Sequence, residues 1–152
     1  MIQIDIYMIY QNLVIHNIIM MKIQNIIIPN QSDIDESFWY SDAIKWAASN
    51  ELISGVGDNL VQPDRDISRE QFVVILYRYA QRSEMDVSAG SQANFSSYRD
   101  ASEISEYATS AFQWACEVGI IKGSPDGFLY PQGNTTRAKA AQMLLNFSKL
   151  VL

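Results

Sequence analysis

Residues 107–148 read YATSAFQWACEVGIIKGSPDGFLYPQGNTTRAKAAQMLLNFS, and residues 39–80 read WYSDAIKWAASNELISGVGDNLVQPDRDISREQFVVILYRYA. A shift of 68 residues aligns the two stretches without a gap. The chain therefore contains an internal duplication, the sequence signature of a repeat architecture. Nine of the 42 aligned positions are identical: Ala43/Ala111, Trp46/Trp114, Ala47/Ala115, Ile53/Ile121, Gly55/Gly123, Asp58/Asp126, Pro63/Pro131, Arg69/Arg137 and Leu76/Leu144.

Each unit is predicted to fold as helix, turn-rich loop and helix. The first segment has apolar residues at i, i+4, i+7 and i+8, the spacing of one helical face. These residues are Trp39, Ala43, Trp46 and Ala47, matched by Tyr107, Ala111, Trp114 and Ala115. Turn formers follow at 54–59 and 122–127, and then a proline, which a helix interior disfavours.

The second helix of each unit is predicted to start at Ser68 or Thr136. Ser68 and Gln71 form a capping box, whereas Lys139 in the second unit cannot return the reciprocal bond to Thr136. The chain is expected to be all-α, because a helix pair this small buries too little surface alone and its second helices must share a core. The core faces are predicted as Phe72, Ile75, Leu76 and Tyr79, matched by Ala140, Met143, Leu144 and Phe147.

The predicted organisation is an apolar segment at 1–30, a repeat at 31–81, a polar linker at 82–94 and a repeat at 95–152. Residues 1–30 lack the basic start of a signal peptide and contain too many polar residues for a membrane span. An ordered strand or helix and sequence upstream of the true start (Met20 or Met21) both stay open.

The composition excludes several classes of function. A net charge of -6 argues against nucleic acid, and 48% apolar residues argue against disorder. Cys116 is the single cysteine and is interpreted as a buried, inert thiol, so disulfides and cysteine-rich zinc sites are excluded. His16 is the single histidine and lies outside the repeats. We expect no enzyme activity, metal or cofactor.

Arg69 and Arg137 are the most informative positions, because each follows a helix cap, where a cation opposes the helix dipole. One interpretation is an anion site built from the guanidinium, free backbone N–H groups and the dipole. The alternative is that each arginine pairs with an acid such as Asp33, Asp66 or Asp100. Trp46 and Trp114 are interpreted as core, Trp39 and Tyr107 as partly exposed, and Asp58 and Asp126 as turn formers rather than calcium ligands.

Several ordered motifs resemble those of the S-layer homology family, over residues 31–149. The second unit contains Tyr98-Arg99-Asp100, Gly119-Ile120-Ile121-Lys122-Gly123, Asp126-Gly127-Phe128-Leu129-Tyr130-Pro131 and Thr135-Thr136-Arg137-Ala138-Lys139. The first contains Asp33, Trp39-Tyr40, Leu52-Ile53-Ser54-Gly55, Asp58 to Pro63 and Ile67-Ser68-Arg69-Glu70-Gln71. Glu51 departs from the family's first glycine, and Gln71 and Lys139 replace the last acid of the arginine motif.

The resemblance implies a cell-wall binding module at the surface of a Gram-positive-type bacterium. Its ligand would be a secondary cell-wall polysaccharide, often pyruvylated, bound in grooves between repeats. It implies ligand-binding roles for Arg69, Arg137, Asp33, Asp100, Trp39, Tyr107, Gly55 and Gly123. The family usually combines three repeats in a pseudo-trimer, so the alternative is a protein–protein module that self-associates or receives a third repeat from another chain. No membrane partner is expected.

Overall fold

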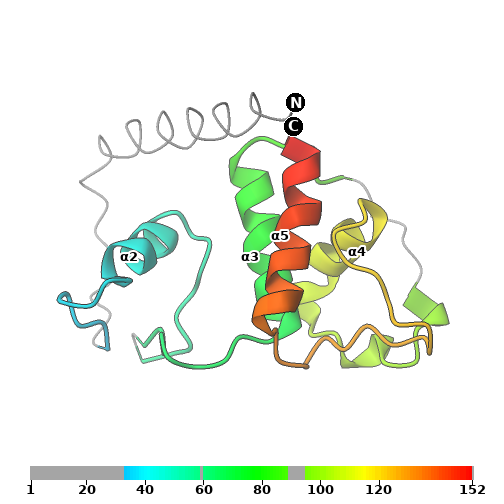
Figure 1. Ribbon diagram of the computed structural model, residues 1–152, viewed down its shortest axis with the longest axis horizontal. Helices are drawn as coiled ribbons and strands as arrows, with labels where there is room; N and C mark the ends of the chain where they lie inside the picture. Colours follow the sequence, from blue (N-terminus) through cyan, green and yellow to red (C-terminus); the bar gives the residue numbers. More distant parts are fainter. Residues whose placement is uncertain (1–32, 59, 89–94, 152) are drawn as a thin grey trace. The chain divides into compact units, whose positions relative to one another are not determined.

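A computed structural model describes residues 33–58, 60–88 and 95–151. Its α-helices are α2 (Ser41–Ser49), α3 (Arg69–Arg82), α4 (Thr109–Glu117) and α5 (Arg137–Val151), shown in Figure 1. Three short 3-10 helices cover Phe95–Ser97, Ala101–Glu103 and Glu106–Ala108. The described ranges contain no strand, so the all-α prediction is confirmed. The predicted segment 1–30 and residues 89–94 of the predicted linker lie outside these ranges.

The helix starts agree with the capping pattern. Ser68 Oγ accepts a hydrogen bond from Gln71 N at 3.2 Å, and Gln71 Oε1 accepts one from Ser68 N at 2.9 Å. Thr136 Oγ1 accepts a bond from Lys139 N at 3.3 Å, without the reciprocal side-chain bond. Each first helix begins two residues later than predicted, because Trp39 and Tyr107 precede α2 and α4.

The hydrophobic core joins the two repeats rather than filling each one. Helix α3 of the first repeat packs against α4 of the second, and Val73, Phe112 and Trp114 are almost completely buried. The Trp114 ring lies edge-on to Tyr77 and Phe147, with centroids 5.5 and 6.3 Å away. The predicted shared core of the second helices is confirmed for Phe147, but Leu144 is 49% exposed and that assignment is wrong.

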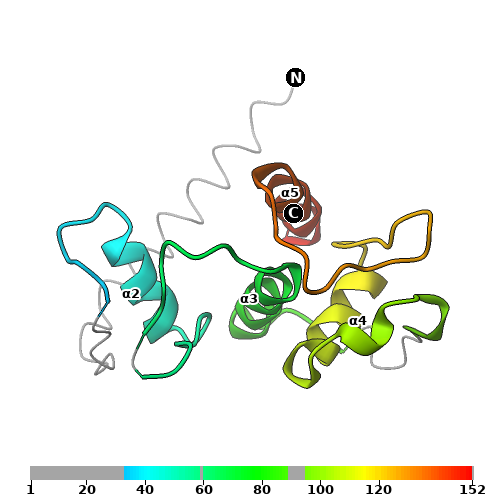
Figure 2. The same cartoon turned by 90° about the horizontal axis from the view of Figure 1, so that it is seen from below.

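Helices α3 and α5 lie side by side and run in the same direction (Figure 1). Figure 2 views the pair end-on from below, with α4 on one side of α3. The Tyr79 and Phe147 rings connect the two helices, with their centroids 5.9 Å apart. As a result, Arg69 and Arg137 both lie at the same end of this helix pair, where α3 and α5 begin.

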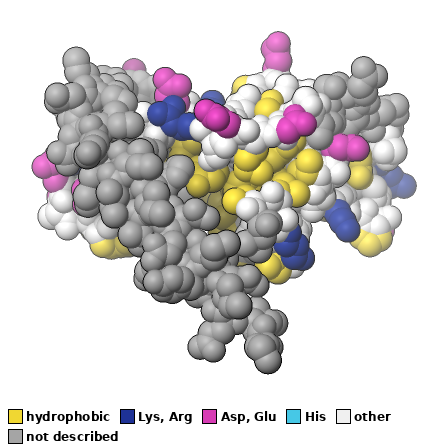
Figure 3. Space-filling model, turned by 90° about the horizontal axis from the view of Figure 1, so that it is seen from above, with side chains coloured by type: hydrophobic (Ala, Val, Ile, Leu, Met, Phe, Trp, Pro, Cys, Tyr) yellow, Lys and Arg dark blue, Asp and Glu magenta, His cyan; other side chains and the backbone are white. Residues whose placement is uncertain are grey.

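Hydrophobic side chains also reach the surface. Figure 3 shows them gathered over the middle of one face, with acidic and basic side chains around them. Trp39, Leu144 and Leu145 are 90%, 49% and 52% exposed. None of the helices in the described ranges has the length and apolar character that crossing a bilayer requires.

Candidate functional site

Each repeat holds its loop with an aspartate that precedes its first helix. The Asp100 carboxylate accepts hydrogen bonds from Leu129 N at 2.8 Å and Tyr130 N at 2.7 Å. The Asp33 carboxylate accepts the corresponding bonds from Val61 N at 3.0 Å and Gln62 N at 2.6 Å. The N–H of Val61 is the main reason that the Asp33 pKa lies below its usual value. Each carboxylate therefore holds the loop of its own repeat in place.

The two matched glycines stand where the chain leaves no room for a side chain. A Cβ at Gly55 would lie 2.8 Å from the carbonyl oxygen of Leu60. A Cβ at Gly123 would collide with the ring of Tyr98. Gly55 thus allows a close backbone approach, and Gly123 allows an aromatic ring to cover the loop.

The start of α3 is attached to the second repeat through its backbone. Arg69 N donates to Gly133 O at 2.8 Å, and Glu70 N donates to Pro131 O at 2.9 Å. These bonds use two of the N–H groups that a helix N-terminus leaves unpaired. The expectation of free N–H groups beside Arg69 is therefore wrong, and any anion site here depends on the guanidinium itself.

The Arg69 side chain is half-buried at the junction between the repeats. Its Nη2 donates to the carbonyl oxygen of Lys122 at 3.1 Å, while its buried Nε has no partner among the described residues. Burial lowers the pKa of Arg69, and the nearby Cys116 thiol and Asp100 carboxylate act in the opposite direction. The group stays charged at neutral pH because the pKa of arginine starts so high.

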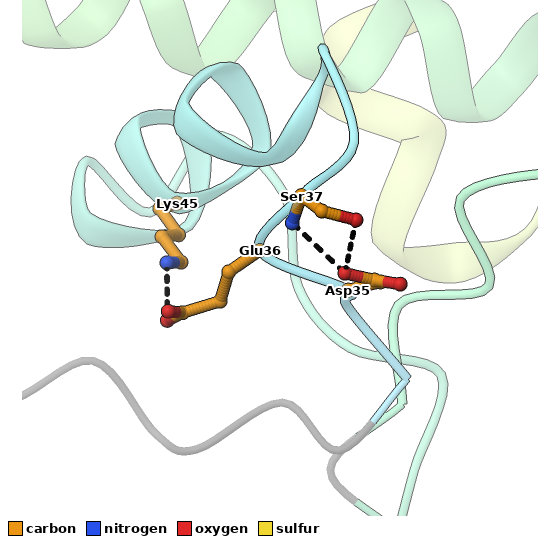
Figure 4. A network of polar contacts seen from close by, with 4 residues as sticks. All are labelled: Asp35, Glu36, Ser37 and Lys45. Atoms are coloured by element: carbon orange, nitrogen blue, oxygen red, sulfur yellow. Dashed lines mark hydrogen bonds and ion pairs between the residues drawn. The ribbon is translucent and has the colours of Figure 1, made fainter.

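The alternative of an acid-paired arginine is wrong for both positions. Within the described ranges, the single ion pair joins Lys45 Nζ to Glu36 Oε1 at 2.7 Å (Figure 4). Arg69 is instead partly dehydrated, with no carboxylate of the described residues within ion-pairing distance. A dehydrated cation of this kind gains more from a bound anion than an exposed cation does.

Glu70 is a second buried charge at the junction, and the sequence analysis did not identify it. Its carboxylate is 3% exposed and accepts hydrogen bonds from Ser105 N, Ser105 Oγ and Tyr107 OH at 3.1, 2.9 and 2.7 Å. Burial raises the Glu70 pKa, but the bonds from Tyr107 and Ser105 outweigh it and hold the pKa below its usual value. Burial, with the bond to Glu70, raises the pKa of Tyr107 to about 12. The sequence contained one signal for Glu70: its counterpart in the second repeat is Ala138.

The counterparts at Arg137 and in the first repeat lie in a different environment. Arg137 is exposed, and Trp39, the counterpart of Tyr107, is 90% exposed. Ser37, the counterpart of Ser105, donates from N and Oγ to Asp35 Oδ1 at 2.8 and 2.7 Å (Figure 4). Arg69 and Arg137 therefore differ in environment, although they occupy equivalent positions in the two repeats. The second repeat lies beside Arg69, whereas no repeat of the described residues lies beside Arg137.

A separate pocket lies within the first repeat, between the end of α2 and the second half of α3. Asn50, Ser54, Arg78 and Arg82 line it, together with Glu51 and Gln81. Its arginines already have partners: Arg78 Nη1 donates to Ser54 Oγ at 2.9 Å, and Arg82 Nε donates to Asn50 Oδ1 at 2.8 Å. These bonds hold α2 against α3, so the pocket is a weaker candidate than the junction.

These features define a class of protein: a helical module of tandem repeats joined by a common core, with a half-buried arginine at the repeat junction. The model of the S-layer homology domain matches residues 32–73 and 97–141, more than half of the chain. The chain belongs to the S-layer homology domain family. No solved structure shows significant similarity to it.

Several curated proteins contain a related stretch. The chain is 32% identical over 117 residues to an amylopullulanase from Thermoanaerobacterium thermosulfurigenes, covering 74% of this chain and 6% of that protein. It is 25% identical over 112 residues to a cellulosome-anchoring protein from Acetivibrio thermocellus, covering 74% of this chain and 24% of that protein. A cell surface glycoprotein from the same species is 24% identical over 115 residues, covering 74% of this chain and 5% of that protein. The chain thus matches only a small part of each relative's length.

Proposed function

We propose that this chain is a non-catalytic module that anchors to the bacterial cell wall by binding a secondary cell-wall polysaccharide. Membership of the S-layer homology family supports this function. So do the names of two relatives, a cellulosome-anchoring protein and a cell surface glycoprotein. The amylopullulanase match covers 6% of that enzyme and supports no catalytic role for this chain. The cell surface is the corresponding location.

The environment of Arg69 carries the proposal for the ligand's chemistry. The guanidinium is half-buried, bonded to one backbone carbonyl and unpaired by any acid in the described part of the chain. Guanidinium groups bind carboxylates through two parallel hydrogen bonds. A sugar with a carboxylate substituent, such as a pyruvyl ketal, matches this group. A local cation is also required because the chain as a whole carries a net charge of -6.

The other predicted site residues have distinct roles in the proposal. Tyr107 is 57% exposed beside the junction, so its ring offers a stacking surface for a sugar. Gly123 follows Lys122, whose carbonyl holds Arg69, and leaves room for the Tyr98 ring over this loop. Asp33, Asp100 and Gly55 act indirectly by shaping the loops. Arg137 and Trp39 form equivalent contacts only where a further repeat lies beside them.

Arg69→Ala tests the proposal. Binding to purified wall sacculi should weaken about tenfold or more, since a hydrogen bond to a charged group contributes roughly 1.5–3 kcal/mol. Arg65→Ala is the matched control, because Arg65 is an exposed arginine whose Nη1 donates to Gln62 Oε1 at 3.0 Å. Depyruvylated sacculi should bind the unmodified chain as weakly as intact sacculi bind Arg69→Ala. Unchanged binding of Arg69→Ala, with helical circular dichroism retained, would contradict the proposed site.

A further inference from the structure

Both surfaces of the α3–α4 interface have more exposed counterparts among the described residues of the same chain. On α3, Val73, Val74, Leu76 and Ala80 are all buried in the core that α3 shares with α4. The equivalent positions on α5 are Ala141, Gln142, Leu144 and Ser148, of which the first three are exposed and Ser148 is half-buried. Leu145, the counterpart of Tyr77, is 52% exposed. Among the helices of the described ranges, none covers this copy on α5 of the surface with which α3 binds a first helix.

Helix α2 presents the other half of the same interface. Ala111, Phe112 and Trp114 of α4 are at most 1% exposed against α3. Their counterparts are more accessible: Ala43 is exposed, while Ile44 and Trp46 are half-buried. The α5 and α2 surfaces are thus equivalent to the two surfaces that pack together as α3 and α4 within this chain.

The repeats differ at two positions that face each other in the contact, and the two differences make the α5 and α2 surfaces compatible. At the internal junction, buried Glu70 meets the hydroxyl of Tyr107 at 2.7 Å. The corresponding pair at an α5–α2 contact is Ala138 and Trp39, so the carboxylate is replaced by a methyl group and the phenol by an indole. An indole against a methyl group leaves no buried charge to satisfy, whereas Glu against Trp would leave one.

Ser37 supports the same conclusion. Its counterpart Ser105 gives both its N–H and its hydroxyl to Glu70 across the junction. Because Ala138 offers no carboxylate, Ser37 would be left without an acceptor in an equivalent contact. Both of its donors instead go to Asp35, two residues earlier in the same chain (Figure 4). The N–H and hydroxyl of Ser37 therefore already have an acceptor within the first repeat, close to the exposed ring of Trp39.

We propose that the α5 surface of one copy binds the α2 surface of a second copy, head to tail. The α5 surface comprises Ala138, Ala141, Leu144 and Leu145, and the α2 surface comprises Trp39 and Ala43. This contact between chains has the same packing as the α3–α4 contact within one chain. It places Arg137 beside Ser54 and Gly55 of the second copy, the counterparts of the Lys122 and Gly123 that lie beside Arg69. A heterologous contact of this kind closes into a ring or continues as a filament. This self-association involves no glycan, so its test is independent of the test of glycan binding.

Complementary variants test this geometry on the full chain without glycan. Leu145→Asp removes the α5 surface, and Trp39→Asp removes the α2 surface, both at exposed positions that the fold tolerates. The unmodified chain should sediment as a dimer or larger species at tens of micromolar, and each variant alone should sediment as a monomer. An equimolar mixture of the two should form a dimer and nothing larger, because one intact contact remains. Lys139→Glu is the control: it adds an acid to α5 away from this surface and should not change assembly.

Each other result overturns the inference. A monomeric unmodified chain excludes self-association of either kind. Assembly that persists in Leu145→Asp or Trp39→Asp alone assigns the contact to another surface or to a symmetric pairing. Two monomeric variants that fail to combine, with unchanged circular dichroism, exclude the head-to-tail arrangement.

Discussion

Arg69 and Arg137 occupy the same position in the two repeats, yet in the part of the chain that the structure describes only Arg69 contacts a neighbouring repeat. Arg69 lies half-buried against the Lys122 carbonyl, whereas Arg137 is exposed at the start of α5. The local sequence is similar in both places: a hydroxyl residue caps the helix and the arginine follows. The difference comes entirely from what packs beside each helix. A binding position in a repeat protein is therefore a property of two consecutive repeats, and the sequence of one repeat does not define it.

The largest expected effect is a difference in the free energy of unfolding between variants of Trp114 and Trp46. Trp114→Ala should lower the free energy of unfolding by about 3–5 kcal/mol, since removing a large side chain from a closed core leaves a cavity. Trp46→Ala should cost roughly half as much, because Trp46 is only half-buried. Urea unfolding followed by far-UV circular dichroism measures both values. Equal losses would show that the first repeat is packed as tightly as the junction.

Glu70 provides the next test. Glu70→Ala should lower the free energy of unfolding by about 2–3 kcal/mol, because three donors from Ser105 and Tyr107 lose a charged acceptor. Ala138→Glu, at the exposed counterpart, should change it by less than about 0.5 kcal/mol. A large cost for Ala138→Glu would mean that α5 is already covered under the conditions of the measurement.

The pH dependence of the same residue has a definite sign. The Glu70 pKa is lowered from its usual 4.5 in the folded state, so its stabilisation is complete above that value and is lost as the pH falls through the folded pKa. Glu70→Gln removes this titration. Below about pH 4.5, the stability gap between the unmodified chain and Glu70→Gln should narrow. A gap that stays constant on acidification would assign the stability to packing rather than to the charge.

The smallest effects concern the helix caps. Ser68→Ala should lower the free energy of unfolding by about 1 kcal/mol, since it removes a capping box, and Thr136→Ala should cost less. Lys139→Glu should raise stability by a few tenths of a kcal/mol, because it supplies the missing half of the box and an acid near the helix N-terminus. Thermal unfolding midpoints rank the three variants. A stabilising Thr136→Ala would contradict the capping role.

Local patterns predicted the local structure correctly. Duplication, four helices, the capping box at Ser68 and the burial of Trp114 all follow from spacing and residue type. The exposure of Leu144 was missed because the apolar pattern of α5 is the same whether or not a neighbour covers it. The loop bonds of Asp33 and Asp100 were also missed, because each spans about thirty residues and nothing near the aspartate indicates its partner. Glu70 required knowledge of which helix lies opposite.

The pairing of α3 with α4 has a consequence for how such modules can be exchanged between genes. A crossover at the end of a repeat, near Arg82, would separate the two helices that depend most on each other and leave both without their hydrophobic partner. A crossover within the loop before Arg69 would transfer α3, with Arg69 at its start, and α4 as one intact unit. Shuffling should therefore preserve folding when its breakpoints fall inside the repeats rather than between them.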